Sequence, residues 1–454
     1  MTRTKGGLSN KDKMTRAQKR NELKDLNACS ELYQIIKHFF PDLIPLLSQV
    51  KDPRCQNYIT YESKIILLFK ILAGAFHIGS MRKMTEEFNS EKCIKNMGYV
   101  LNEEELAELP HWKTVNDYLE RLAPSELQAV IQELVYHLTR MRSFEDSRTR
   151  GKYWQIIIDG TYLYDSNKRH CPNCLVKNHK DKNENILWTE YYHCALEAKL
   201  VLNGNMVISI ATEFIENENE DVSKQDCELN AFYRLAEKLK KAFPRLPICL
   251  TMDSLYAAGP VFDVCKKNDW RYIIRFKDGS IPSIAEEFQA LKNFLPQQTH
   301  FETKDGITKT YSYITDISYQ SHIVNVVEYT ESGLPYPFVF ITDLSVSKRN
   351  CESTVQDGRR RWKIENKGFN DQKNQGFELK HLFSEDYNAM KNHYLLIQIA
   401  HMITQFVENG LEIWQLIKAP SYMVSQMLKQ SFQTFVLNDA LIETFNPRRK
   451  YRFI

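Results

Sequence analysis

YWQIIIDGT, residues 153–161, is the stretch at which the hydrophobic period of the chain changes. Its apolar run, Tyr153–Ile158, is short and continuous, and Asp159-Gly160 follows it, which is typical of a buried strand that ends in a turn. Before this stretch, apolar residues recur at helical spacing, as they do in residues 32–40. The stretch therefore predicts the boundary between an all-helical first part and a second part that is built around a sheet.

Downstream of this boundary, strand-like and helical patterns alternate. Tyr191–Val201 and Met206–Ile215 flank Asn203-Gly204, which is the strongest short signal for a β-hairpin. A helix, a strand, a helix and a strand follow at 227–243, 247–252, 256–267 and 270–276. This order predicts a mixed α/β core, in which an antiparallel meander of three strands is extended by two strands that follow helical crossovers. The arrangement is that of the RNase H-like fold, and further alternating runs predict a β-rich insertion at 300–345.

The sequence divides into four predicted regions. A basic stretch with few apolar residues precedes the helices, and helical spacing returns after the insertion and continues toward a basic C-terminal end. The predicted regions are a basic flexible arm at 1–27, a helical domain at 28–150, an RNase H-like domain at 151–400 and a helical C-terminal segment with a basic tail at 401–454.

The composition excludes several classes of protein. The chain has 454 residues, and its net charge of +3, from 60 Lys+Arg and 57 Asp+Glu, is unlike that of a histone-like polycation or an acidic disordered protein. Hydrophobic residues make up 43%, enough for a sizeable core, and 16 Gly and 15 Pro are too few for a collagenous or low-complexity chain. No apolar run reaches the ~18 residues of a membrane span, and no signal peptide begins the sequence. We therefore expect a soluble cytoplasmic protein whose ten cysteines are reduced or bound to metal.

Three acidic residues are candidates for catalysis. Asp159 and Asp253 each follow a predicted strand, and acids at the ends of neighbouring strands converge at one edge of a sheet. An acid after a strand also commonly starts a turn. For each aspartate alone, a turn-forming role therefore explains its position as well as a catalytic role does. Glu365 lies in RRRWKIENK, residues 359–367, where it follows Arg361 by four positions and shares its helical face. A surface ion pair would explain that spacing, but one acid among five cations also suits a site for a metal ion and a phosphate.

These motifs resemble those of the DDE transposases of bacterial insertion sequences, which share the RNase H-like fold with retroviral integrases. The resemblance rests on DGT at 159–161, on Asp253 and on Arg361-x3-Glu365, and it covers roughly residues 110–410. More narrowly, the third motif is similar to a Tyr-x2-Arg-x3-Glu-x6-Lys signature.

Two positions depart from this signature. Gly358 stands in place of the tyrosine, and Gln372, followed by Lys373, stands in place of the lysine. The resemblance therefore carries over Arg361 and Glu365 but not the role of the tyrosine. On an α-helix the residue seven steps from Glu365 faces it better than the residue eight steps away, so Lys373 would need a local bend to serve.

The resemblance implies a DNA transposase that cleaves insertion-sequence ends and joins them to target DNA by two-metal phosphoryl transfer. Asp159, Asp253 and Glu365 would be the catalytic residues and would bind two Mg²⁺ ions, with Mn²⁺ as a substitute. Water would first free a 3′-OH at the element end, and that hydroxyl would then attack target DNA. The cations implied to contact DNA phosphates are Arg361, Lys373, Arg360 and Lys363.

The implied partner is double-stranded DNA, both the terminal inverted repeats of the element and its target. The helical domain at 28–150 would bind the repeats, and such enzymes usually act as homodimers that pair two ends. The implied location is the bacterial cytoplasm, in association with the nucleoid.

A second group of residues has the spacing of metal ligands. Cys171 and Cys174 form a Cys-x2-Cys pair, which is a common half of a zinc site. No second such pair follows, so scattered residues would supply the other ligands, and His193, Cys194 and Cys227 are candidates. The set Cys171, Cys174, His193 and Cys227 is therefore the candidate structural Zn²⁺ site, and reduced thiols without a metal are the alternative.

Three other functions remain open. The first is a catalytically silent DNA-binding protein derived from a transposase, which the presence of all three acids disfavours. The second is a metal-dependent nuclease of the same fold that cleaves DNA without strand transfer. The third is a structural zinc-binding protein, in which replacing Asp159 would leave all activity unchanged.

Overall fold

The computed structural model of the chain describes residues 27–219, 222–304, 306–411 and 419–443, together with Thr15, Gln18, Trp414, Tyr451 and Phe453. Most of the predicted basic arm at 1–27 and most of the predicted basic tail therefore lie outside the described residues. The chain forms two compact units, of which unit 1 comprises residues 1–118, 375–377 and 399–454, and unit 2 comprises residues 119–374 and 378–398. The first boundary between the units falls inside the predicted helical domain at 28–150.

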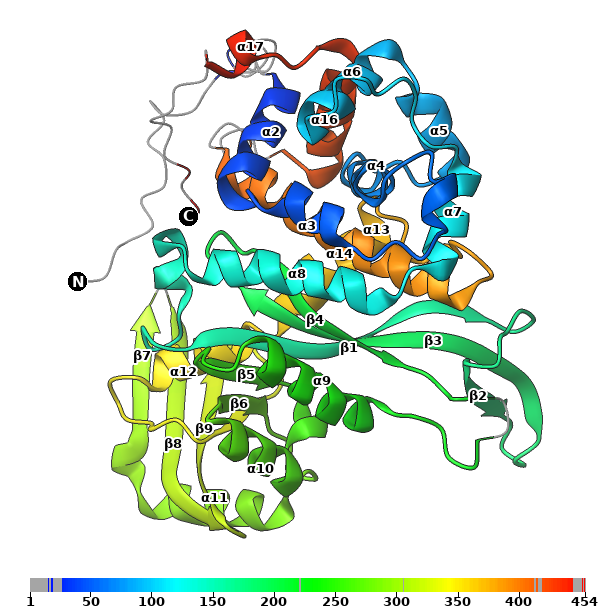
Figure 1. Cartoon of the computed structure of the whole chain (residues 1–454). Coiled ribbons are helices and arrows are strands. Elements are labelled where there is room, and N and C mark those ends of the chain that lie inside the picture. The colour runs from blue at the N-terminus through cyan, green and yellow to red at the C-terminus, as the bar shows by residue number, and fades with distance from the viewer. Residues whose placement is uncertain are drawn as a thin grey trace. The chain divides into compact units, whose positions relative to one another are not determined.

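Among the described residues, unit 2 contains one mixed sheet of ten strands. The strands are β1 (Trp154–Ser166), β2 (Leu175–Lys180), β3 (Ile186–Val201), β4 (Val207–Ile215), β5 (Ile248–Met252), β6 (Arg271–Arg275), β7 (Thr299–Lys304), β8 (Ile307–Tyr319), β9 (His322–Glu331) and β10 (Phe338–Thr342). They lie in the order β2-β3-β1-β5-β6-β10-β9-β8-β7, and β4 pairs with β3 (Figure 1).

The central strands run in the directions that the sequence predicts. β1 is antiparallel to β3, and β3 is antiparallel to β4, which forms the predicted meander. β5 runs parallel to β1 and β6 runs parallel to β5, and these strands follow the helices α9 (Glu228–Ala242) and α10 (Gly259–Asn268). This arrangement is consistent with an RNase H-like core.

Strands β7–β10 occupy the interval of the predicted β-rich insertion. β10 pairs antiparallel with β6, and β9, β8 and β7 follow it by antiparallel pairing. The insertion therefore continues the central sheet.

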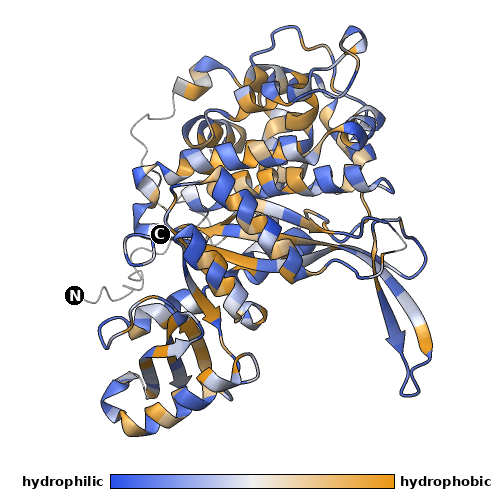
Figure 2. Ribbon diagram, turned by 60° about the horizontal axis from the view of Figure 1, so that its bottom comes forward, coloured by the Kyte–Doolittle hydropathy of each residue, from blue (hydrophilic) through white to orange (hydrophobic). Residues whose placement is uncertain are grey.

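Two local predictions are wrong. β1 does not end before Asp159 but continues to Ser166, because residues 159–166 pair with residues 191–197 of β3. The strand predicted at Tyr191–Val201 begins earlier, at Ile186, where it pairs with β2, a strand that the sequence did not predict. This hairpin extends away from the helices of unit 2 (Figure 2), and most of its side chains are at least partly exposed. A strand pair without a buried face lacks the hydrophobic alternation from which strands are predicted.

The helices of unit 2 cover the central strands. β4 and β5 are buried along their whole length, and α8 and α9 both contact β4. Figure 2 shows the hydrophobic residues concentrated along the central strands. The remaining helices of this unit are α8 (Pro124–Thr139), η3 (Arg142–Ser147), η4 (Ser254–Tyr256), α11 (Pro282–Phe294), η5 (Pro296–Gln298), α12 (Cys351–Arg359), the π-helix η6 (Ile364–Phe369), α13 (Asn370–Asn374) and the first part of α14 (Tyr387–Gly410).

Unit 1 is helical throughout its described residues. Its helices are α2 (Ala28–Phe39), α3 (Leu43–Gln49), η2 (Gln56–Tyr58), α4 (Ser63–Ala75), α5 (Met81–Phe88), α6 (Glu91–Leu101), most of α7 (Trp112–Arg121), the end of α14, α16 (Ser421–Thr434) and α17 (Asp439–Glu443). The backbone N–H of Cys29 donates to Ser431 Oγ at 3.0 Å, and Asn96 Nδ2 donates to the carbonyl of Phe432 at 2.8 Å. The C-terminal helix α16 therefore packs with the N-terminal helices. No helix in the described part of the chain is long and apolar enough to cross a membrane.

Candidate active site

Asp159 and Asp253 lie at the same level on neighbouring parallel strands. Ile157 of β1 is the register partner of Thr251 of β5, and each aspartate follows its partnered residue by two positions. Because residues two apart on a strand point to the same face, both carboxylates project from the same face of the sheet. Asp253 also caps η4, since its Oδ1 accepts a hydrogen bond from the backbone N–H of Leu255 at 2.8 Å.

Arg361 links Glu365 to the first of these aspartates. Its Nη1 donates to Asp159 Oδ2 at 2.8 Å, and both of its Nη atoms lie 3.3 Å from Glu365 Oε1. Arg361 and Glu365 therefore share one face, as their spacing predicts. The guanidinium group joins two acids that come from different elements, β1 and η6.

The π-helix η6 holds Glu365 against the sheet. Ile364 and Phe369 are buried and belong to a cluster with Ile157, Val201 and Val207. The five-residue interval between Ile364 and Phe369 is the repeat of a π-helix, so both side chains reach the same apolar surface. The apolar side of η6 is thus anchored on the sheet while Glu365 remains exposed.

A buried polar network lies beneath the same helix. A Cβ atom on Gly368 would lie 3.2 Å from Lys199 Cδ, so the helix approaches Lys199 closely. Lys199 Nζ donates to Gln398 Oε1 at 2.6 Å and lies 3.6 Å from Glu197 Oε2, and both charged side chains are fully buried. Gln372 Nε2 donates in turn to Gln398 Oε1 at 2.8 Å. The network connects the helical segment that carries Glu365 to β3 and to α14.

The other acids of the site raise the proton affinity of Asp159. Burial raises the pKa of Asp159 to about 7; Arg361 lowers it, and Glu365, Glu228 and Asp253 raise it. This concentration of carboxylates is the environment in which a bound cation is stabilising.

Glu228 is an acid that the sequence analysis did not single out. Its Oε1 accepts a hydrogen bond from the Tyr256 hydroxyl at 2.8 Å, and its Oε2 lies 2.9 Å from where a Cβ on Gly160 would stand. Successive residues on a strand point to opposite faces, so Glu228 lies on the other side of β1 from the carboxylate of Asp159. It contacts the residue after Asp159 and the turn that follows Asp253, and so lies against the segments that carry both aspartates. The only sequence signal was an acid at the start of an amphipathic helix, which is common at helix starts.

Lys373 interacts electrostatically with Asp159, whereas Gln372 does not face the acids. Gln372 is fully buried in the polar network. The π-helix adds a residue to its turn, so the eighth residue after Glu365 takes the direction that the seventh would have on an α-helix. Burial and the charge of Lys380 lower the pKa of Lys373, whereas the charge of Asp159 is among those that raise it. The local bend that Lys373 requires is therefore present.

The cations Arg360 and Lys363 have partly buried side chains. Arg360 Nη1 donates to Gln155 Oε1 at 3.2 Å and lies 3.1 Å from Asp357 Oδ1, so this guanidinium is tied to the fold. Burial, with the charge of Arg360, lowers the pKa of Lys363 to about 8.

A cavity of about 310 Å³ adjoins Arg361. Its lining includes Arg275, Phe340, Arg359, Arg361 and Trp362. Three guanidinium groups and exposed aromatic surface suit an anionic ligand such as a nucleic-acid phosphate.

The departure from the signature at Gly358 has a steric reason. A Cβ atom at this position would lie 2.6 Å from the ring of Phe340, which is buried on β10. The β-rich insertion therefore fills the space into which a side chain at position 358 would extend.

Gly358→Ala is accordingly expected to lower the free energy of unfolding by about 1–3 kcal/mol, because an aromatic ring in a packed core cannot move aside without strain. The urea midpoint of the purified protein measures the effect. The same substitution in a Phe340→Leu background is expected to cost less, and equal costs in both backgrounds would show that the ring is not the obstacle.

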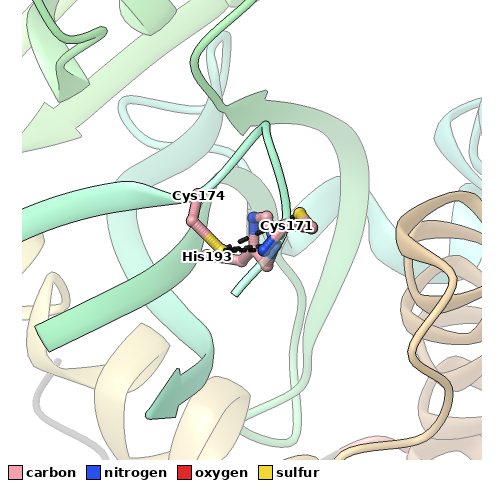
Figure 3. Close-up of side chains that lie close together, drawn as sticks. All are labelled: Cys171, Cys174 and His193. Carbon is pink, nitrogen blue, oxygen red and sulfur yellow. Dashed lines mark hydrogen bonds between the residues drawn. The ribbon is translucent and has the colours of Figure 1, made fainter. Parts of the chain in front are cut away.

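Apart from the acids, the structure brings together three of the four predicted zinc ligands. His193 Nε2 lies 3.2 Å from Cys171 Sγ and 3.4 Å from Cys174 Sγ, and the two sulfurs are 3.8 Å apart (Figure 3). Hydrogen bonding with Cys174 lowers the pKa of Cys171 to about 4, with His193 acting in the same direction and burial opposing it. Cys227 is exposed at the start of α9 and is not part of this group.

A comparison with protein-family models matches part of the chain. A family model described as the transposase DDE domain matches residues 217–403, which include Asp253 and Glu365 and begin after Asp159. Residues 217–403 are therefore similar to the transposase DDE domain. This match supports the interpretation of the chain as a DDE transposase of an insertion sequence. A search of curated proteins gave no significant match to the chain.

Proposed function

We propose that this chain is a DNA transposase that cleaves the ends of an insertion sequence and joins them to target DNA. The observation that carries the proposal is the pair of aspartates at one level of two parallel strands, with Arg361 joining Asp159 to Glu365. The family match supports the same chemistry. The strand order around β1 and the insertion after β6 support an RNase H-like catalytic domain at 151–400.

The acids fit a pair of Mg²⁺ ions, for which Mn²⁺ would substitute. Hard divalent cations prefer carboxylate oxygens, and Asp159, Asp253 and Glu365 supply three such groups, of which Asp253 and Glu365 act electrostatically on Asp159. When bound, the ions would activate the attacking hydroxyl group and stabilise the charge that develops on the phosphate. We therefore assign catalysis and metal binding to these three residues.

The cations of the chain would hold and orient the DNA backbone. Arg361 presents a planar guanidinium next to the acids, a group suited to bidentate contact with a phosphate. Lys373 would contact a neighbouring phosphate, and Arg360 and Lys363 would add salt-dependent attraction. Together these residues would fix the scissile phosphate in line for attack.

We further propose that the helical domain at 28–150 recognises the terminal inverted repeats, and that two chains pair the two ends of one element. The resemblance to transposases supports both statements. The place of action would be the bacterial cytoplasm, at the nucleoid.

The test is strand transfer by the full-length chain. The protein is incubated with Mg²⁺, labelled linear DNA that carries the inverted repeats flanking its gene, and a plasmid target. We expect labelled joined product that requires both the repeats and the divalent ion. Cleavage without joining would identify a nuclease of the same fold, and binding of the repeats without cleavage would identify a silent DNA-binding protein.

A further inference from the structure

We propose that Cys171, Cys174 and His193 bind one Zn²⁺ ion, with the fourth coordination position open to the adjacent cavity. This site lies apart from the acids and does not depend on the proposed transposase function. It differs from the site that the sequence predicts, since Cys227 is not a ligand.

The distances between the three ligand atoms match the edges of a zinc tetrahedron. With Zn–S of about 2.3 Å and Zn–N of about 2.0–2.1 Å, tetrahedral geometry places two sulfurs about 3.8 Å apart and a sulfur about 3.6 Å from a nitrogen. The observed sulfur–sulfur distance is 3.8 Å, and the two sulfur–nitrogen distances are 3.2 and 3.4 Å. A disulfide would require a separation of about 2.05 Å, so the thiols are placed for a shared ion rather than for a bond to each other.

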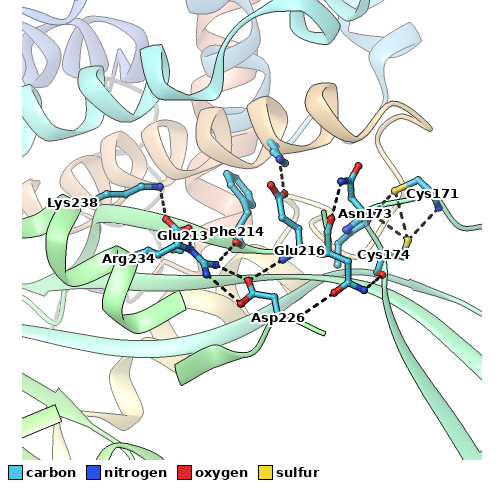
Figure 4. Close-up of polar contacts among 12 residues, drawn as sticks. Cys171, Asn173, Cys174, Glu213, Phe214, Glu216, Asp226, Arg234 and Lys238 are labelled. Atoms are coloured by element: carbon cyan, nitrogen blue, oxygen red, sulfur yellow. Dashed lines mark hydrogen bonds and ion pairs between the residues drawn. The ribbon is translucent and has the colours of Figure 1, made fainter. Parts of the chain in front are cut away.

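The turn that carries the cysteines is preformed. The backbone N–H of Cys171 donates to Cys174 Sγ at 3.3 Å, which stabilises negative charge on that sulfur, and the N–H of Cys174 donates to the carbonyl of Cys171 at 3.1 Å. Asn217 Nδ2 donates to the Cys174 carbonyl at 2.9 Å, and Asn173 Nδ2 donates to the Asn217 carbonyl at 2.9 Å. Figure 4 shows both cysteines directed to one side of this turn. The turn therefore presents both sulfurs without further rearrangement.

His193 is held with Nε2 toward the two sulfurs. Its ring stacks on Tyr387, with centroids 3.8 Å apart and an interplanar angle of 13°. Nδ1 is buried and has no hydrogen-bond partner among the described residues, so stacking rather than a hydrogen bond orients the ring. His193 is 2% exposed, and its Nε2 is the ring nitrogen that faces both sulfurs.

The three ligands line one cavity, which leaves room for a fourth ligand. The cavity has a volume of about 280 Å³, and its other lining residues include His170, Ser384 and Glu385. Within the described residues, no fourth His, Cys, Asp or Glu joins the group of three. The ring of His170 stacks instead on Tyr191, with centroids 4.3 Å apart. Water or a small ligand from the cavity would therefore complete the coordination.

A bound ion would fasten the segment between β1 and β2 to β3. The two cysteines precede β2. His193 lies on β3, directly after the residues of β3 that pair with β2. The predicted consequence is that metal removal loosens the β2–β3 hairpin while leaving the acids in place.

The experiment measures metal in the full-length protein purified with a reducing agent and without added metal. We expect one zinc per chain by elemental analysis, retained after gel filtration against a weak chelator. Exchange for Co²⁺ should give the visible and thiolate charge-transfer absorption of a tetrahedral cobalt site. Cys171→Ser, Cys174→Ser and His193→Asn should each lose the metal, whereas Cys227→Ser should retain it in full.

Cys227→Ser is the matched control, because it removes an exposed thiol that the sequence also offers as a candidate ligand. Metal loss from this variant equal to that from Cys171→Ser would overturn the assigned ligand set. Wild-type protein that holds no zinc, or that isolates with a Cys171–Cys174 disulfide, would overturn the proposal. If the ligand variants do not fold, the zinc content and cobalt spectrum of the wild-type chain still decide, since a cobalt site without thiolate absorption would also overturn it.

Discussion

Replacing Glu365 with Gln is expected to reduce DNA cleavage by on the order of 10³-fold or more while leaving DNA binding intact. A carboxylate that holds a catalytic cation contributes several kcal/mol to transition-state stabilisation, and each ~1.4 kcal/mol is a factor of ten in rate. The substitution keeps the size of the side chain and removes only its charge. The buried residues that seat η6, Ile364 and Phe369, are unchanged, so the fold should be unaffected.

Cleavage of labelled repeat-end DNA and its electrophoretic mobility shift measure the two properties separately. The matched control is Glu286→Gln, which neutralises an exposed side chain on α11 and should retain full activity. Equal loss of cleavage and binding in Glu365→Gln would refute the assigned role. Full cleavage would remove Glu365 from the site altogether.

The second large effect is expected at the buried pair of Glu197 and Lys199. Glu197→Gln leaves the ammonium group of Lys199 buried without its counter-charge. Lys199→Met likewise leaves the carboxylate of Glu197 buried without its counter-charge. Both side chains are 0% exposed. Breaking such a pair costs about 3–5 kcal/mol, because neither charge can recover its hydration inside the fold. Each single variant is therefore expected to unfold at a clearly lower urea concentration than the wild type.

The double variant separates the charge effect from the loss of packing. Glu197→Gln with Lys199→Met removes both charges and is expected to recover most of the stability, as replaced ion pairs do in other folds. Glu91→Gln, which breaks an exposed ion pair with Lys95 on α6, should leave the urea midpoint unchanged. Additive losses in the double variant would show that the two side chains contribute independently.

Much of the core could be predicted because its strands are buried on both faces. The start of β1, β5 and β6 are short continuous apolar runs, and the Asn-Gly turn between β3 and β4 is a local signal. Such patterns depend only on neighbouring residues. The order of elements along the chain then restricts the topology to few choices.

The hairpin of β2 and β3 could not be predicted in the same way. Its strands are stabilised by pairing with each other, and their side chains are polar or exposed, so no alternating pattern marks them. The continuation of β1 past Asp159 likewise depends on a partner strand that lies far along the sequence.

The sequence alone determined which acids follow short apolar runs and which acid lies among cations, because these are properties of local order. It thereby identified Asp159, Asp253 and Glu365 as candidates. Only the tertiary structure decided which side chains meet. The parallel register sets the two aspartates at one level, and the buried polar network holds Gln372.

Glu228 and the metal ligands are further cases in which only the tertiary structure decided which side chains meet. Glu228 contacts the segments that carry both aspartates, and Cys227, its neighbour in sequence, lies outside the zinc group. Spacing along the chain could not predict that Glu228 lies near the aspartates while Cys227 lies outside the zinc group. Contacts between distant segments are fixed by strand register and helix packing. Those interactions form only when the whole sheet is assembled.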